Sequence, residues 1–211
     1  PDVVVSCLRG ESSRQLEAHR VVAEFLSRHH GTLVYLSTAN VFDGDLSRPH
    51  YEGDPPQPHS AYGQFKAACE TLLQARLGES LVILRPPEIW GLDCPRLHDL
   101  IRRLRAGSPV QTYENLSVNY AADTQIARWT AFILKQGLRG VFHVGTQDIS
   151  DYTLFLKRLA EGLNLPPPVF ALERNGIPRY QAVLPGRGEI PARLQLSVDD
   201  VLCGLTNASA L

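Results

Sequence analysis

Short apolar runs alternate along the chain with segments in which apolar residues recur at helical spacing. The runs predict strands at 3–5, 32–36, 81–84 and 141–144, and the periodic segments predict helices at 15–28, 61–77, about 96–106, 123–135 and 152–163. Alternation of this kind joins parallel strands through helical crossovers. The sequence therefore predicts an α/β fold with a parallel sheet and helices on both faces. The first run, Val3 to Val5, is expected to be a buried strand rather than an edge.

Two segments do not follow this alternation. Residues 43–60 are rich in proline, glycine and aspartate and predict a long irregular loop, a feature that in compact domains is usually functional. The proline run 166–168 predicts a break before a carboxyl-terminal tail that the pattern does not assign to strand or helix.

Composition narrows the class of protein. The 211 residues carry a net charge of −1 and 44% hydrophobic residues without a long apolar run, which predicts one soluble globular unit with no nucleic-acid or membrane role. The four cysteines lack C-x-x-C spacing and the histidines lack ligand spacing, so we expect reduced thiols, no disulfide framework and no metal site. No signal-peptide pattern opens the chain, and the cytoplasm is the expected compartment.

Tyr62 and Lys66 are the first candidates for chemistry. Residues four apart lie on one face of a helix, so the Lys66 ammonium is expected near the Tyr62 phenol. A neighbouring cation favours phenolate and would lower the tyrosine pKa, which allows proton transfer near neutral pH. The alternative is a tyrosine that caps the core beside a solvated lysine.

The predicted topology places further polar groups near this pair. Ser37 and Thr38 follow the strand 32–36, and the loop 86–91 follows the strand 81–84. Ligands bind at the carboxyl ends of the strands in open parallel sheets. We therefore expect the hydroxyl pair, the loop and Tyr62 to line one crevice.

Three motifs together resemble the extended short-chain dehydrogenase/reductase superfamily, and within it the dTDP-4-dehydrorhamnose reductase branch. They are S-T-A-N-V-F-D-G at 37–44, Y-E-G-D-P at 51–55 and Y-G-Q-F-K at 62–66. The resemblance implies that residues 1–91 are the carboxyl-terminal half of a Rossmann-like domain. Residues 92–211 would be a small, mixed substrate-binding region, with late Rossmann elements at about 119–145 that return to the sheet.

The resemblance also implies an activity: NAD(P)-dependent reduction or epimerisation of a nucleotide-diphosphate 4-keto sugar. Thr38 would bind the substrate carbonyl, Tyr62 would transfer a proton, and Lys66 would tune Tyr62 and hold the nicotinamide ribose of NADP or NAD. Cofactor contacts are expected from Ser37, Tyr62, Lys66 and Pro86, and substrate contacts from Asn40, Glu88, Arg187 and Arg193. The partner would be the nucleotide sugar, and the resemblance also allows a homo-oligomer.

Two departures from the family pattern qualify this interpretation. Ala39-Asn40 replaces the acidic pair that dehydratases carry after the threonine, which favours reduction or epimerisation over elimination. The chain contains no glycine-rich G-x-x-G-x-x-G turn to hold the cofactor pyrophosphate, and it contains no methionine. We expect the missing amino-terminal strands and this turn in a segment of several tens of residues upstream of Pro1.

Alternatives remain open for the function and for the basic residues of the helix at about 96–106. A non-catalytic, sugar-nucleotide-binding or regulatory subunit would have the same fold. The complete set of Thr38, Tyr62 and Lys66 favours catalysis, because a purely structural relative has no physical need for all three. The arginines at 96, 102, 103 and 105 are either a solvated basic face or a surface that attracts a diphosphate.

Overall fold

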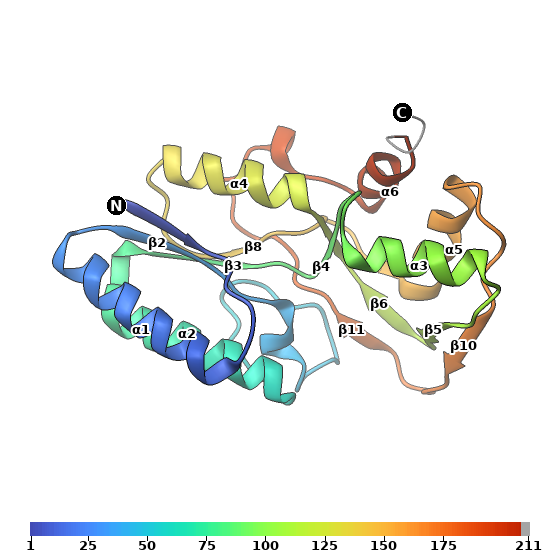
Figure 1. The fold of residues 1–211 in the computed structure, drawn as a ribbon, viewed down its shortest axis with the longest axis horizontal. Coiled ribbons are helices and arrows are strands. Elements are labelled where there is room, and N and C mark those ends of the chain that lie inside the picture. Colours follow the sequence, from blue (N-terminus) through green and yellow to red (C-terminus); the bar gives the residue numbers. More distant parts are fainter. Residues whose placement is uncertain (208–211) are drawn as a thin grey trace.

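The computed structural model describes residues 1–207, and a four-stranded parallel sheet forms its centre. The strands are β1 (Val3–Ser6), β2 (Thr32–Leu36), β3 (Leu81–Arg85) and β8 (Gly140–His143), in the order β1-β2-β3-β8. Helices α1 (Ser12–Arg28) and α2 (Ala61–Leu77) cover one face, and α4 (Asp123–Lys135) covers the other (Figure 1). The predicted α/β parallel sheet with helices on both faces is confirmed.

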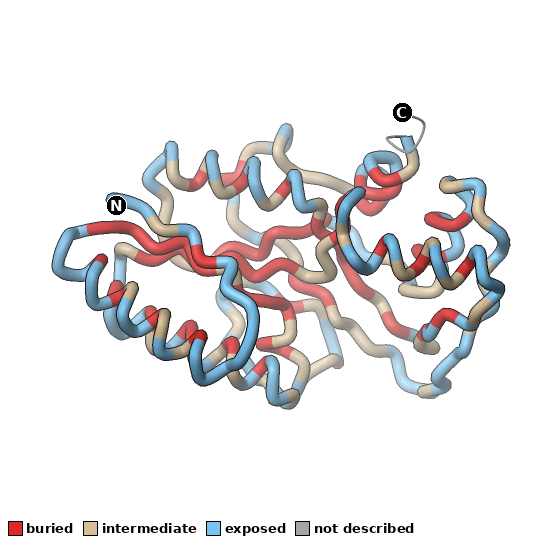
Figure 2. Tube along the Cα trace, viewed as in Figure 1, coloured by how far each residue is buried: buried red, intermediate tan, exposed pale blue. Residues whose placement is uncertain are grey.

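The alternation of side chains in β2 explains why its apolar run is continuous. Leu33 and Tyr35 pack with α1 and α2, whereas Val34 packs on the opposite face against Trp129 and Ile133 of α4. Both faces of the strand are therefore buried, as parallel sheets require. Figure 2 shows the central strands as the most continuously buried part of the tube.

The first strand is less buried than expected. Strand β1 lies at the edge of the sheet and pairs with β2 alone among the described residues. Its Val3 and Val5 side chains are 41% and 51% exposed. An apolar run does not distinguish an edge strand from a central one, because the pattern of side chains contains no information about which neighbours are present.

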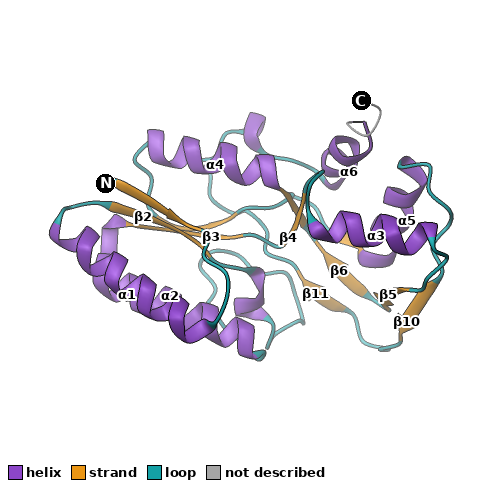
Figure 3. Cartoon of the chain, in the orientation of Figure 1, coloured by secondary structure: helices purple, strands orange, loops and turns teal. Residues whose placement is uncertain are grey.

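The second part of the structure packs short strands and helices around a separate core. Its elements are β4 (Glu88–Trp90), α3 (Pro95–Arg105), β5 (Val110–Tyr113), β6 (Leu116–Val118), β7 (Tyr120–Ala122), β9 (Ser150–Asp151), α5 (Tyr152–Gly162), β10 (Phe170–Glu173), β11 (Arg179–Gln181) and α6 (Val198–Asn207). The 3₁₀ helices are η1 (Ala39–Phe42), η2 (Gly78–Ser80) and η3 (Ala192–Leu194). Figure 3 shows β5, β6, β10 and β11 beside α3 and α5, away from the amino terminus.

The carboxyl-terminal tail, which the sequence pattern did not assign, is part of this fold. Strands β10 and β11 pair in parallel with β5 and β6, and α6 contributes Val201, Leu202 and Leu205 to the second core. The proposed division at residue 91 stays a prediction, although β8 of the later region does pair with β3 of the central sheet. None of the helices within residues 1–207 has both the length and the apolar character to cross a bilayer.

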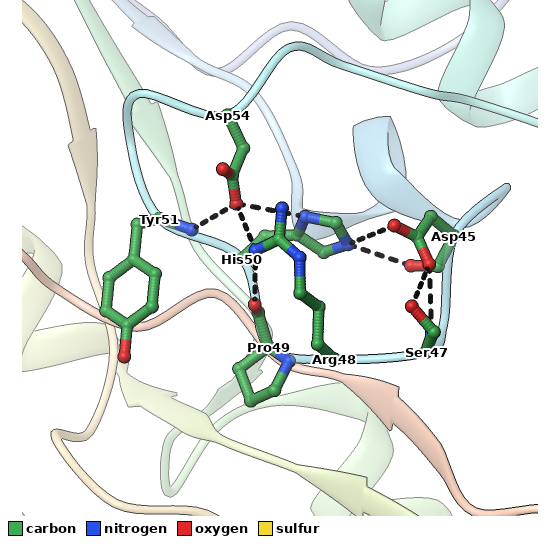
Figure 4. Close-up of polar contacts among 7 residues, drawn as sticks. All are labelled: Asp45, Ser47, Arg48, Pro49, His50, Tyr51 and Asp54. Atoms are coloured by element: carbon green, nitrogen blue, oxygen red, sulfur yellow. Dashed lines mark hydrogen bonds and ion pairs between the residues drawn. The ribbon is translucent and has the colours of Figure 1, made fainter.

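The long loop at 43–60 is held by its own polar residues, which Figure 4 shows, and by backbone hydrogen bonds to the tail. The Asp54 carboxylate accepts hydrogen bonds from Arg48, from the Tyr51 amide and from His50. The buried His50 ring stacks on Phe42 with 4.4 Å between centroids. The His50 amide donates to the Ala182 carbonyl, and the Leu184 amide donates to the His50 carbonyl. The loop is therefore fixed against the segment that follows β11.

We expect acid to loosen this loop. The hydrogen bond from Arg48 and the Tyr51 amide hold the pKa of Asp54 well below its usual value. A carboxyl group whose pKa is lowered in the folded state stabilises that state above its unfolded pKa, and the contribution is lost as the pH falls through the folded value. Hydrogen exchange at the His50 amide should therefore quicken as the pH falls below about 4, after correction for intrinsic exchange.

The variant Asp54→Asn tests the assignment of this effect. It should show faster exchange at the His50 amide already at neutral pH and should lose most of the added acid dependence. Asp93→Asn is the matched control, because Asp93 is exposed. Equal protection in wild type and Asp54→Asn at neutral pH would contradict the assigned role.

Candidate active site

A crevice of about 580 Å³ opens at the carboxyl ends of β2 and β3. Its volume lies within the usual range for small-molecule sites. The lining residues are Cys7, Leu8, Arg9, Leu36, Ser37, Thr38, Ala39, Asn40, Tyr62, Lys66, Pro86, Pro87, Glu88, Ile89, Cys94, Pro95, Arg96 and Gln181. The structure thus brings together the strand ends, the start of α2 and the 86–91 loop in one cavity.

Thr38 follows the carboxyl end of β2 and caps the amino terminus of η1. Its backbone is extended, and its hydroxyl accepts a hydrogen bond of 3.2 Å from the Asn40 amide at the start of η1. The same hydroxyl donates to the Asn40 Oδ1 atom at 3.2 Å. These two hydrogen bonds fix the Thr38 side chain at the wall of the crevice.

Tyr62 lies in the first turn of α2, which Ser60 caps by accepting a hydrogen bond from the Gly63 amide. The tyrosine is 52% exposed and faces the cavity. Burial of the phenol raises its pKa and outweighs the hydroxyl of Thr38 and the charge of Arg9, which both favour phenolate. The phenol therefore holds its proton at neutral pH.

Lys66 is directed toward the strand instead of the phenol. Its Nζ atom donates a 2.7 Å hydrogen bond to the Leu36 carbonyl and lies 4.6 Å from the centre of the Tyr35 ring. Burial lowers the pKa of Lys66. The expectation that Lys66 lowers the Tyr62 pKa is wrong for this arrangement, because the tyrosine pKa is raised and the opposing influences come from Thr38 and Arg9.

A buried polar network supports the crevice from below. The Ser37 hydroxyl donates to Glu70 Oε1, and Arg85 donates to both oxygens of Glu70 at 3.1 Å and 2.6 Å. All three residues are at most 5% exposed. The network links the ends of β2 and β3 to α2. Ser37, predicted as a cofactor contact, does line the cavity, but its hydroxyl proton is committed to Glu70.

The remaining predicted contacts divide into two groups. Asn40, Pro86 and Glu88 line the cavity, whereas Arg187 and Arg193 do not. Arg187 donates to the Arg139 carbonyl at 2.7 Å and its guanidinium lies 3.9 Å from the centre of the Phe142 ring. It therefore packs against β8. Arg193 is an exposed residue of η3.

Two arginines of the crevice were not assigned as site residues from the sequence, although Arg96 was one of the four arginines considered as a surface that attracts a diphosphate. Arg9 lies in the loop after β1, and Arg96 lies in the first turn of α3. The sequence did contain a signal for Arg96, since it follows Pro95 at the start of a helix directly after the 86–91 loop. Within residues 1–207 no group of three or more histidine, cysteine or acidic side chains is arranged to hold a metal ion.

The crevice fits one end of a nicotinamide dinucleotide. Thr38, Tyr62, Lys66 and Pro86 provide hydroxyl, ammonium and apolar groups in one cavity, which suits a nicotinamide and its ribose. The 211 residues contain no glycine-rich turn at the end of a strand, so they offer no backbone cradle for the pyrophosphate.

Comparison with known proteins places this geometry in a family context. The family model for the RmlD substrate binding domain matches residues 11–178. A probable dTDP-4,6-dihydroxy-2-methyloxan-3-one 4-ketoreductase of Streptomyces antibioticus is 42% identical over 77 residues, which are 36% of this chain and 25% of that protein. A dTDP-4-keto-6-deoxy-D-glucose reductase of Streptomyces niveus is 28% identical over 112 residues, 53% of this chain and 39% of that protein. The chain spans less than half the length of these relatives.

Solved structures share the fold. A dTDP-4-dehydrorhamnose reductase of Clostridium acetobutylicum superposes with a TM-score of 0.85 at 17% identity, over 100% of this chain and 82% of that one. The Bacillus anthracis dTDP-4-dehydrorhamnose reductase in complex with NADP superposes with a TM-score of 0.81 at 18% identity, over 98% and 79%. At these identities the similarity establishes the Rossmann-like fold.

Proposed function

Because the chain belongs to the RmlD substrate binding domain family, as its sequence motifs predicted, we propose that it carries the acid–base centre of an NAD(P)-dependent reductase. The substrate would be a nucleotide-diphosphate sugar with a keto group at carbon 4. One observation carries the proposal: Thr38, Tyr62 and Lys66 line the same cavity at the carboxyl ends of β2 and β3. The names of the two Streptomyces relatives, a ketoreductase and a keto-sugar reductase, support this substrate class.

Thr38 and Tyr62 would act on the carbonyl oxygen of the substrate. The Thr38 hydroxyl and the Tyr62 phenol would both donate to the carbonyl oxygen and so stabilise the charge that develops on it. Tyr62 would then transfer its proton to that oxygen. The raised pKa of Tyr62 suits this direction of transfer, because an acid must hold its proton at neutral pH before reaction.

Lys66 and Pro86 would hold the cofactor. The Lys66 ammonium is anchored to the Leu36 carbonyl and keeps further donors for the hydroxyls of a ribose. A bound, reduced nicotinamide would supply the hydride. Reduction or epimerisation is favoured over elimination, because Ala39 and Asn40 provide no acid or base at the positions that dehydratases use.

A non-catalytic, sugar-nucleotide-binding subunit is the second candidate. The same fold can bind a nucleotide sugar without catalysing a reaction on it, because fold alone does not determine function. The two functions differ in what they require: reduction needs a nicotinamide cofactor to bind beside Tyr62, whereas a binding subunit needs only the nucleotide sugar.

Fluorescence titration of the full-length protein with NADPH and NADH separates these functions. We expect one of them to bind and to be oxidised when dTDP-4-keto-6-deoxyglucose is added. Thr38→Val should lower turnover by roughly 10-fold or more, because it removes one donor to the oxyanion, with little effect on cofactor affinity. A folded full-length protein that binds the nucleotide sugar but neither dinucleotide would contradict the reductase proposal and support the binding subunit.

A further inference from the structure

An ion pair crosses the wall of the crevice between β4 and α3. The Arg96 NH1 atom lies 2.5 Å from the Glu88 Oε2 atom, and both residues line the cavity that holds Thr38 and Tyr62. The Arg96 guanidinium also lies 5.5 Å from the centre of the Trp90 ring. The two contacts hold Arg96 at the cavity, while its side chain stays 44% exposed.

Arg96 keeps hydrogen-bond donors for a ligand besides its contact with Glu88. The lining contains the cations Arg9, Lys66 and Arg96 and one acidic residue, Glu88. The Lys66 ammonium is anchored to the Leu36 carbonyl, and the charge of Arg9 favours the phenolate form of Tyr62. A guanidinium has five N–H donors in a planar fork that matches a phosphate group. Since the Glu88 contact uses NH1, other donors of Arg96 remain for a ligand.

The Glu88 carboxylate depends on Arg96 for its charge. Burial raises the pKa of Glu88, and Arg96 is the largest influence that opposes this rise. The other titratable groups around it are phenols: Tyr120 lies opposite Glu88 in the β4–β7 ladder, and Glu88 helps to raise the pKa of Tyr152 at the start of α5 to about 12. Both phenols are neutral at physiological pH, so Arg96 is the one charged partner that faces Glu88 in the described structure.

We propose that Arg96 binds the diphosphate of the nucleotide-sugar substrate and that Glu88 is its internal counter-ion. The inference rests on the proposed function and adds the residue that recognises the anionic part of the substrate. A diphosphate at Arg96 competes with the Glu88 carboxylate for the guanidinium and repels it. Glu88 therefore takes up a proton as the diphosphate binds, and its charge weakens binding at neutral pH.

Calorimetric titration with thymidine diphosphate tests this assignment. Arg96→Gln should bind roughly 10- to 100-fold more weakly than wild type, since it loses charge-assisted hydrogen bonds. Arg96→Lys keeps the charge without the planar fork and should give an intermediate loss. Arg105→Gln is the matched control, because Arg105 lies on the same helix but outside the crevice, and it should bind as wild type does.

Glu88→Gln gives the test of the counter-ion. It should bind thymidine diphosphate a few-fold more tightly than wild type at neutral pH, and the difference should shrink as acid neutralises Glu88 in the wild type. Titrations in buffers of different ionisation enthalpy should show proton uptake on binding by wild type and less uptake by Glu88→Gln.

The opposite results would overturn the inference. An Arg96→Gln variant that binds as well as Arg105→Gln excludes Arg96 as the anion ligand, and so does wild type that does not bind thymidine diphosphate. Weaker or unchanged binding by Glu88→Gln excludes the counter-ion role. If thymidine diphosphate binds at Arg96 but the protein shows no turnover, the proposed reductase is refuted and the Arg96 site stands. If the protein shows turnover but Arg96→Gln binds thymidine diphosphate as well as wild type does, the Arg96 site is refuted and the reductase stands.

Discussion

Tyr62→Phe is expected to lower the turnover of a nucleotide-diphosphate 4-keto sugar by about 10²- to 10⁴-fold, the usual contribution of a general acid. The change removes the hydroxyl that interacts with Thr38 and leaves the aromatic ring in place. Tyr62 is half-exposed in the first turn of α2, so the free energy of unfolding should change by no more than about 0.5 kcal/mol. Steady-state kinetics of cofactor oxidation measure the loss.

The pH dependence of the same reaction provides an independent check. Because burial raises the pKa of Tyr62 above its ordinary value, the phenol stays protonated through neutral and mildly alkaline conditions. The rate of reduction should therefore fall only above about pH 10, the ordinary tyrosine value. A fall near pH 7 to 8 that is absent from Tyr62→Phe would instead indicate a tyrosine whose pKa is lowered when ligands bind.

Tyr51→Phe is the control for both experiments. Tyr51 is 47% exposed, comparable to Tyr62, but lies in the loop at 43–60 and outside the crevice. Its loss of a hydroxyl should leave turnover unchanged. If Tyr62→Phe retained more than about a tenth of the wild-type turnover, the tyrosine would not be the general acid.

The elements that were predicted well from the sequence have local signals at both ends. Helix α2 was predicted at 61–77 and is observed there, because Ser60 caps its start and Gly78 ends it with a positive φ of 49°. The gathering of Thr38 and Tyr62 in one crevice follows from the parallel strand–helix–strand connection, since Thr38 follows the end of β2 and the helix with Tyr62 in its first turn begins at the same edge of the sheet.

The features that were missed depend on contacts between distant segments. The spacing of Tyr62 and Lys66 gives their shared helix face but not the Leu36 carbonyl that captures the ammonium. The pair of Glu88 and Arg96 joins two elements whose relative position the sequence pattern does not contain. Likewise, strands β10 and β11 have three or four residues each, too few for a reliable period of two.

The second large effect is a loss of stability, which is expected when Glu70 in the buried network beneath the crevice is replaced. Glu70→Ala removes the carboxylate that accepts from Ser37 and Arg85 and leaves the Arg85 guanidinium buried without an anion. Removal of one partner of a buried ion pair costs about 3–5 kcal/mol, because an uncompensated charge remains. Chemical denaturation should show this loss in the free energy of unfolding. Glu79→Ala, at an exposed position just after α2, should change it by about 0.5 kcal/mol or less.

The double variant Glu70→Leu with Arg85→Met separates charge from packing. Replacement of both partners by apolar side chains removes the buried charge altogether, and such replacements are often neutral or stabilising. The double variant should therefore be more stable than Glu70→Ala. The Ser37 hydroxyl would lose its acceptor in both variants, so the end of β2 and the neighbouring Thr38 should lose order. Turnover should therefore stay low even in the double variant, where stability is restored. If the double variant is as unstable as Glu70→Ala, the network contributes to stability mainly through hydrogen bonds to the strand ends. If the double variant has full turnover, the Ser37 hydroxyl does not need the Glu70 carboxylate as its acceptor.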